Sequence, residues 1–281
     1  MSLKQVVGEV KKLVSFPTVA NELFSIIDSD TSDAQAISNV IQLDPALSAS
    51  LLKLANSAWY MAREPVSSIE GAIIRIGTRD VGKIAMNICV QNSFKDIPEH
   101  LFSLDDYLNH SLRCAFASQE VARRANLSNL GTMYTAGLLH DIGQLIILNL
   151  YPEKSGQVLA MNIEDYDGTN LQACEYKIFG FDHTQVGNEL AKTWNFPNIL
   201  QQCIHHHHLP NNATESIAEV CSIHIANSIA TLNEFDSDNL NDASTVHEFA
   251  LSETKLTQSD IIDIADISSH LYKNNRDRMF I

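Results

Sequence analysis

The stretch from Thr135 to Leu148 constrains this chain most, because it is apolar on almost every side and yet carries His140 and Asp141 side by side. A helix that is hydrophobic all round belongs in a protein core. A carboxylate there needs a cation, a metal or several donors, since unpaired burial costs several kcal/mol or raises its pKa until it is neutral. Gln144, four residues after His140, shares its helix face. The sequence predicts an apolar helix with one polar facet.

Two interpretations of this facet are open. In the first, Asp141 caps a neighbouring helix or accepts a hydrogen bond from an arginine, and His140 is a core histidine with satisfied hydrogen bonds. In the second, further imidazoles join the pair: His110 upstream, His183 downstream and the run from His205 to His208. Imidazoles gathered around a carboxylate suit a first-row metal. Spacing alone does not show that these side chains converge.

Length and charge restrict the classes of partner. A chain of 281 residues can bury a sizeable core in one or two domains. Its net charge of -15 and pI near 5.0 argue against direct nucleic-acid binding, which needs clustered Lys and Arg. No apolar run approaches the roughly 20 residues of a membrane span, and residues 1–13 lack the apolar core of a signal peptide. We expect a cytoplasmic protein without a membrane partner.

The five cysteines are scattered singly, with no CxxC pair. An odd, dispersed set in a cytosolic chain is typical of reduced, buried thiols and not of a zinc site or a disulfide framework. These residues are Cys89, Cys114, Cys174, Cys203 and Cys221.

Helical periodicity dominates the chain, with no convincing strand pattern and no Gly-rich phosphate loop. The predicted class is all-α with two lobes, an N-terminal helical lobe over residues 1–100 and a second lobe over 101–281 that ends in a C-terminal helix; a polar loop at 96–103 divides them. Asp44 and Asp182 are expected N-caps. Helices are expected over residues 16–28, 45–54, 69–76, 79–91, 104–125, 215–230 and 258–272, and from about residues 33, 152, 183 and 198.

Several separated motifs occur in a fixed order. The first lobe contains Phe16-Pro17-Thr18-Val19-Ala20, Asp44-Pro45-Ala46-Leu47, Leu54-Ala55-Asn56-Ser57-Ala58, and Ser68-Ile69 to Ile76-Gly77. The second contains His110-Ser111, Gly137 to Gly143, Phe179-Gly180-Phe181-Asp182-His183, His207-His208-Leu209-Pro210 and His224-Ile225-Ala226-Asn227. With this set the chain resembles the HDOD family, the HD-related output domains of bacterial signalling, over roughly residues 13–230.

The resemblance implies a metal site, because the HDOD family is similar to the HD phosphohydrolases. The residues that match metal ligands there are His110, His140, Asp141 and Asn227 for a first metal, and His183, His207 and His208 for additional ones. The expected cofactor is one or two divalent transition metals, namely iron, manganese, nickel or zinc. His205 and His206 are expected to face solvent. If the chain is catalytic, Asp141 and Gln144 belong to the catalytic group.

The HD-GYP phosphodiesterases are the HD enzymes in which further histidines hold additional metals. Three departures of this sequence from their pattern argue against catalysis. Asn227 stands where a terminal Asp would bind metal, Gln144 stands where a lysine would offer charge to phosphate, and residues 209–212 replace the Gly-Tyr-Pro loop. Each lost charge removes on the order of 3 kcal/mol of electrostatic stabilisation.

The expected function is therefore a non-catalytic signalling module that binds a signalling protein or a small phosphorylated ligand. Two alternatives stay open: a metal-dependent phosphohydrolase acting on a nucleotide or cyclic nucleotide, and a metal-stabilised binder without turnover. Asn56, Ser57 and Trp59 are expected to shape a contact between the lobes or a partner site, or else simply to pack. The last helix could support a homodimer.

Overall fold

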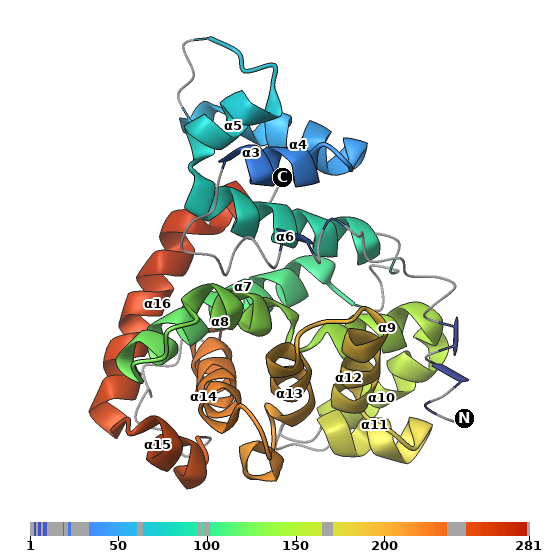
Figure 1. Cartoon of the computed structure of the whole chain (residues 1–281). Helices are drawn as coiled ribbons and strands as arrows, with labels where there is room; N and C mark the ends of the chain where they lie inside the picture. The colour runs from blue at the N-terminus through green and yellow to red at the C-terminus, as the bar shows by residue number, and fades with distance from the viewer. Residues whose placement is uncertain are drawn as a thin grey trace.

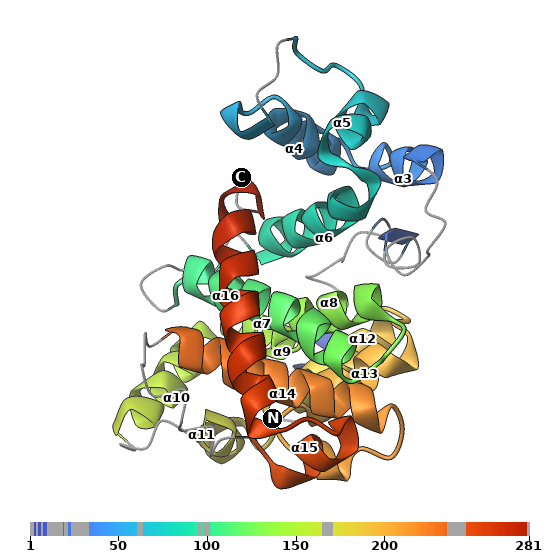
Figure 2. The ribbon, with the colours of Figure 1, turned by 90° about the vertical axis from the view of Figure 1, so that its left-hand side faces the viewer.

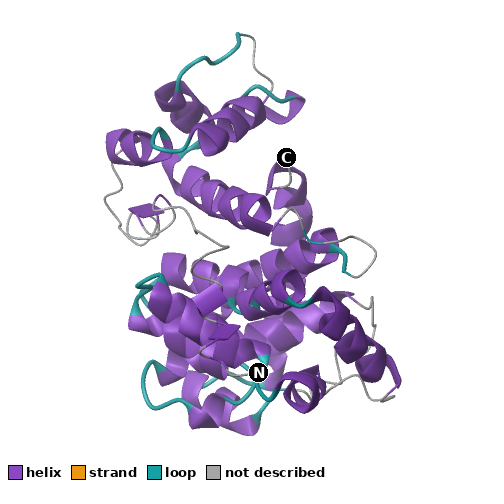
Figure 3. Ribbon diagram, turned by 90° about the vertical axis from the view of Figure 1, so that its right-hand side faces the viewer, coloured by secondary structure: helices purple, strands orange, loops and turns teal. Residues whose placement is uncertain are grey.

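The chain is all-α, as predicted, in a computed structural model (Figures 1 and 3). The structure describes residues 34–60, 64–94, 97, 102–164, 171–234 and 246–279, together with single positions at 3, 5, 6, 8, 9, 19, 22 and 23. Within these ranges every regular element is a helix. The helix expected over 16–28, with its Phe16-Pro17-Thr18 motif, falls almost wholly outside the described residues.

The described helices before residue 95 pack on one another, and the name first lobe refers to these helices. Its elements are α3 (Ala34–Ile41), α4 (Pro45–Ala55), the 3-10 turn η1 (Ala58–Tyr60), α5 (Ile69–Ile76) and α6 (Thr78–Phe94). The carboxylate of Asp44 accepts hydrogen bonds from the backbone N–H groups of Ala46 and Leu47, at 2.9 and 3.0 Å, and Pro45 occupies the first turn. The predicted cap at Asp44 is confirmed.

The second lobe contains the remaining helices. They are α7 (Leu104–Arg124), α8 (Leu130–Leu139), α9 (Ile142–Leu150), α10 (Pro152–Glu164), α11 (Leu171–Phe179), α12 (His183–Thr193), α13 (Asn198–His206), the 3-10 turn η2 (Pro210–Asn212), α14 (Ile217–Glu234), α15 (Glu248–Thr254) and α16 (Gln258–Met279). Asp182 forms the predicted cap of α12, in a reciprocal capping box with Gln185.

The expected single helix over Thr135 to Leu148 is wrong, because the chain turns at His140 and Asp141 and forms two helices, α8 and α9. Asp141 has φ -100° and ψ 13°, outside the helical range, and it stands as the N-cap residue of α9. The break lets α9 pack against α12 while α8 packs on α7. Gln144 therefore does not share a continuous helix face with His140.

Helix α7 is the centre of the second lobe, in contact with α8, α14 and α16. Helix α16 crosses α7 and reaches α6 of the first lobe, as Figure 2 shows. There the side-chain amides of Asn87 and Gln91 both donate hydrogen bonds to the carbonyl oxygen of Met279. The last turn of α16 thus joins the two lobes.

The main hydrophobic cluster contains residues of the helices from α3 to α14 and also Tyr272 and Met279 of α16, and a smaller one lies between α7, α14, α15 and α16. The division near residue 100 therefore stays a prediction. All five cysteines are buried, as expected, and none of them forms a disulfide in the structure. Among the helices of the described ranges, none combines the length and the apolar character that crossing a membrane requires.

Candidate metal centre

The structure brings the seven candidate metal ligands together from five parts of the second lobe. His110 comes from α7, the pair His140 and Asp141 from the turn between α8 and α9, and His183 begins α12. His207 and His208 follow α13, and Asn227 lies on α14. Asp141 lies at the centre, only 6% exposed.

Close backbone packing holds the turn in place, and two glycines make it possible. A Cβ atom on Gly137 would lie 2.8 Å from the Cα atom of Ala115 in α7. A Cβ atom on Gly143 would lie 1.9 Å from the carbonyl oxygen of His183, and 2.8 Å from the backbone nitrogen of Gly187 in α12. No side chain fits at either distance. The glycines let the turn approach α7 and α12 closely enough for the histidines to reach Asp141.

Four imidazoles point their Nε2 atoms at the carboxylate of Asp141. The distances to Oδ1 are 3.3 Å from His183 and 3.2 Å from His207, and those to Oδ2 are 3.1 Å from His140 and 3.9 Å from His110. His208 joins through its Nε2, 3.1 Å from that of His183. Each oxygen of the carboxylate therefore faces a different group of histidines, so one carboxylate could serve two cations.

Three of these rings have their other nitrogen bound to an acceptor. The Nδ1 atoms lie 2.8 Å from the carbonyl oxygen of Gly137 for His140, 3.0 Å from that of Ile204 for His207, and 2.7 Å from a carboxylate oxygen of Glu175 for His183. Carbonyl and carboxylate oxygens only accept, so each Nδ1 carries the proton. In the neutral form, each ring then presents a lone pair from Nε2 to Asp141.

This arrangement leaves buried polar atoms without hydrogen bonds. They are Nε2 of His140, Nε2 of His207 and Oδ1 of Asp141. Nitrogen and carboxylate lone pairs that face each other in a core repel unless a proton or a cation lies between them. Imidazole nitrogens with one carboxylate are the donors that first-row transition metals prefer. The residues present therefore fit a metal ion, and two sets of donors lie within 4.8 Å: Asp141, His183, His207 and His208, and His110, His140 and Asp141.

The charges of the site also favour the binding of cations. Burial opposes ionisation of Asp141, yet the neighbouring histidines, His140 foremost, hold its pKa well below the usual range. Burial disfavours the imidazolium of His183, but Glu175 and Asp141 outweigh it and raise its pKa to about 10. For His207 burial prevails and lowers the pKa to about 4. Asp141 thus stays ionised and draws positive charge to its side.

Asn227 does not face Asp141 directly. Its Oδ1 lies 3.0 Å from Nε2 of His110, and an amide oxygen accepts, so the ring nitrogen donates in this pair. A metal at this nitrogen would have to displace that proton. The donor set around His110 thus has three ligands with a neutral amide beside them, whereas the set around His183 has four ligands.

Sequence analysis missed Glu175, which is 3% exposed and accepts from both the backbone N–H and Nδ1 of His183, at 2.9 and 2.7 Å. Such a carboxylate fixes the tautomer and the orientation of a ligand histidine. A lone glutamate in α11 resembles an ordinary surface residue, so no sequence signal marks it. His205 and His206 are half-buried and belong to neither donor set, so they are less open to solvent than expected.

A cleft of about 740 Å³ opens beside the metal centre. Its walls come mainly from α7 and α16, and Asp141 and Gln144 also line it. Its lining residues are Phe102, Asp106, Tyr107, Asn109, His110, Arg113, Asp141, Gln144, Tyr272 and Arg276. The predicted residue Gln144 therefore lies in the same cavity as the metal-facing carboxylate.

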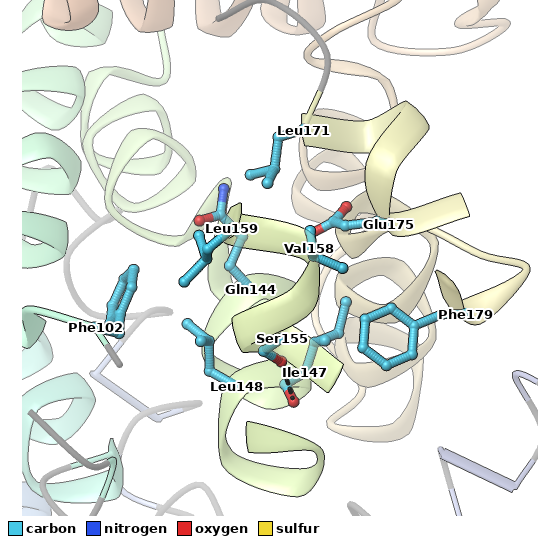
Figure 4. A pocket seen from close by; sticks show the side chains of 10 residues that line it. All are labelled: Phe102, Gln144, Ile147, Leu148, Ser155, Val158, Leu159, Leu171, Glu175 and Phe179. Carbon is cyan, nitrogen blue, oxygen red and sulfur yellow. Dashed lines mark hydrogen bonds between the residues drawn. The ribbon is translucent and has the colours of Figure 1, made fainter. Parts of the chain in front are cut away.

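A smaller apolar pocket lies on the other side of Gln144, between α9, α10 and α11 (Figure 4). Phe179, Val158 and Leu159 lie along its wall, and the hydroxyl of Ser155 donates to the carbonyl oxygen of Ile147 at 3.3 Å. Its volume of about 30 Å³ has room for one or two water molecules. The cleft, and not this pocket, is therefore the space for a ligand.

Known proteins of similar fold agree with this architecture. A structure of an HDOD domain protein of unknown function from Geobacter sulfurreducens is 23% identical, with a TM-score of 0.76, over 99% of this chain and 98% of that one. A protein from Shewanella amazonensis SB2B, provisionally described as a phosphohydrolase, is 23% identical with a TM-score of 0.73, over 98% and 96% of the two chains. At these identities the likeness concerns the fold.

An uncharacterized protein of Treponema pallidum is 22% identical over 224 residues, which cover 79% of this chain. The match covers only 43% of that protein, so the chain spans less than half the length of this curated relative. The model of the HDOD domain matches residues 13–210, well over half of the sequence. The chain belongs to the HDOD family.

Proposed function

We propose that the chain is a signal-transducing module that binds a small ligand beside a metal centre and does not hydrolyse it. The observation that carries this proposal is the contact of Asn227 with His110, at 3.0 Å, where the resemblance to HD phosphohydrolases calls for a carboxylate. A neutral amide brings no negative charge and leaves the proton on the ring nitrogen. The donor set around His183 then has four ligands, whereas the set around His110 lacks a fourth ligand.

The set with four ligands consists of Asp141, His183, His207 and His208. Three imidazoles and a carboxylate fit a divalent iron, manganese, nickel or zinc ion. When bound, such an ion polarises an oxygen atom of a ligand as a Lewis acid. The chain's own contribution is to orient the rings, through Glu175 and two backbone carbonyls, and to hold Asp141 ionised.

Elemental analysis of untagged protein, purified without chelators, tests the metal centre. We expect about one transition metal ion per chain, lost in His207→Ala and kept in His206→Ala. His206 is the matched control, since it neighbours His207 but belongs to neither donor set. A folded wild-type protein without metal, or equal metal content in both variants, would contradict the proposed centre.

A phosphodiesterase assay with bis-p-nitrophenyl phosphate and with linear and cyclic nucleotides tests the absence of turnover. We expect metal-loaded protein to hydrolyse these compounds no faster than His207→Ala does. One observation favours the alternative of a phosphohydrolase: the two oxygens of Asp141 face two different donor sets, as a two-metal site requires. Hydrolysis by the wild type alone would establish that alternative.

The protein partner and the homodimer remain proposals. The side chain of Asn56 forms hydrogen bonds within its own loop. Its Oδ1 accepts from the backbone N–H of Val66 at 2.7 Å, and its Nδ2 donates to the carbonyl oxygen of Val66 at 2.8 Å. Trp59 on η1 is 48% exposed, and α4 and α5 lie at the end of the first lobe remote from α7 (Figures 1 and 2). We propose the surface around Trp59 as the contact for a signalling protein. Sedimentation of purified protein at two concentrations tests the homodimer.

A further inference from the structure

Arg113 lies on the wall of the cleft. Among the residues that the structure describes, no carboxylate is within ion-pair distance of its guanidinium, and its Nε is buried without a hydrogen bond. Removing a charge from water without pairing it is costly. An unpaired guanidinium on the wall of a cavity is therefore a candidate group for binding an anion.

A tyrosine of the C-terminal helix positions this arginine. The Cζ atom of Arg113 lies 3.9 Å from the ring centroid of Tyr272, within the range of a cation–π contact. The hydroxyl of Tyr272 donates to Oδ1 of Asn109 at 2.5 Å, which fixes the ring. Stacking occupies one face of the guanidinium and leaves its edge, where the N–H donors lie, for a ligand.

A second arginine lies in the same cleft. Nε of Arg276 donates to Oδ1 of Asn109 at 3.0 Å, so α16 supplies both the tyrosine and another guanidinium. The cleft also contains two carboxylates: Asp106 is exposed, and Asp141 is turned toward the histidines. Arg276 also lies 3.6 Å from a carboxylate oxygen of Asp277, so Arg113 is the less neutralised of the two arginines. Gln144, another lining residue of the cleft, is neutral.

We infer that Arg113, stacked on Tyr272 and assisted by Arg276, binds the phosphate group of a small phosphorylated ligand in the cleft beside the metal centre. The planar fork of a guanidinium matches two phosphate oxygens at once. The cleft of about 740 Å³ has the size of a site for a nucleotide-sized molecule. This inference rests on the proposed ligand-binding function and names the ligand class and its anchor.

Two of the proposed phosphate-binding residues lie outside the range that the HDOD family model matches. The HDOD model ends at residue 210, whereas Tyr272 and Arg276 lie on α16. The metal centre is built from α7 to α14, and the anion site is completed by the last helix. The ligand preference of this chain is therefore set by its C-terminal helix.

Calorimetric titration of the full chain with inorganic phosphate tests the inference, with acetate as the control anion. We expect phosphate to bind, acetate to bind far more weakly, and Arg113→Ala to weaken phosphate binding about tenfold or more. Arg113→Lys should bind at an intermediate affinity, because it keeps the charge but loses the fork. Arg124→Ala is the matched control: Arg124 lies on the same helix but pairs with Asp260 and lies outside the cleft.

The same titration on His207→Ala separates this inference from the metal centre. Phosphate binding that is lost in Arg113→Ala but retained in His207→Ala supports the arginine anchor even if the metal proposal fails. Phosphate binding that disappears in His207→Ala and persists in Arg113→Ala would assign the anion to the metal and overturn the inference. So would a wild type that binds no phosphate, or an equal loss in Arg124→Ala. Thermal unfolding of each variant verifies that it is folded.

Discussion

Glu175 holds His183 by two hydrogen bonds to one carboxylate oxygen, from the backbone N–H at 2.9 Å and from Nδ1 at 2.7 Å. The ring is thereby fixed with Nε2 toward Asp141, and the negative charge of the glutamate increases its basicity. Glu175, which belongs to neither donor set, thus affects how tightly the set that contains His183 binds a metal.

We expect Glu175→Gln to lower the affinity for the metal by about 10- to 100-fold, because the amide oxygen can still accept hydrogen bonds but carries no negative charge. Competition with a chromogenic chelator measures this change. Glu153→Gln is the control, since Glu153 is exposed on the neighbouring helix α10. Unchanged affinity in Glu175→Gln would show that the pair serves folding alone.

We expect Asn227→Asp to raise the metal content from about one to about two ions per chain. The new carboxylate would lie beside His110 and add a second anionic donor to a set whose one carboxylate, Asp141, is shared with the other set. Elemental analysis gives the result, and the phosphodiesterase assay on the same sample shows whether turnover appears. Metal content equal to that of the wild type would mean that charge at residue 227 is not what limits the second site.

We expect Gly143→Ala to destabilise the protein by about 3 kcal/mol or more, since its Cβ would lie 1.9 Å from the carbonyl oxygen of His183 and would force α9 away from α12. Urea unfolding measures the loss, and the metal content should fall with it because His183 moves. Gly8→Ala, whose Cβ would meet nothing within 4 Å, is the control. A variant as stable as wild type would refute the close approach of the two helices.

Stability should fall at alkaline pH through Cys89. Burial, with a smaller effect of Asp44, raises the pKa of this thiol to about 12. Between about pH 9 and pH 12 the unfolded chain loses the proton while the folded chain keeps it, so the free energy of unfolding decreases as pH rises, by on the order of 1 kcal/mol per pH unit. Urea unfolding at pH 8 and pH 10 should show a smaller decrease in Cys89→Ala; an identical decrease would contradict the assignment.

Asn56 and Trp59 should differ in their effect on folding. Asn56→Ala removes the bonds that close the loop to Val66 and should cost about 1–3 kcal/mol. Trp59→Ala, at a half-exposed position, should cost about 1 kcal/mol or less. Chemical denaturation of both variants gives the comparison. If Trp59→Ala were the more destabilising, the indole would be a packing residue and the proposed partner contact would lose its support.

Local sequence rules were enough for the helical class and for the helix caps. Asp44 and Asp182 are acidic residues directly before apolar periodicity, and both cap as expected. The turn at His140 was not predictable from the same rules, because the apolar residues on both sides continue one helical pattern. What breaks the helix there is the packing of Gly143 against α12, a contact between residues distant in the sequence.

The candidate site shows the same division between local and distant information. The seven candidate ligands came from a family resemblance, and spacing alone did not show that they meet. Arg113 and Tyr272 lie 159 positions apart by their numbering, so their stacking could not be inferred from either helix. Glu175 and Arg113 both resemble solvated charges on amphipathic helices until the fold shows which side is enclosed.

The bonds from Asn87 and Gln91 to the carbonyl of Met279 also bear on biosynthesis. They connect residues 192 and 188 positions apart, so they form only after translation has passed residue 279. Until then the amides of Asn87 and Gln91 lack the acceptor that α16 supplies. A premature stop before residue 279 would therefore remove a contact of a helix that was translated long before it.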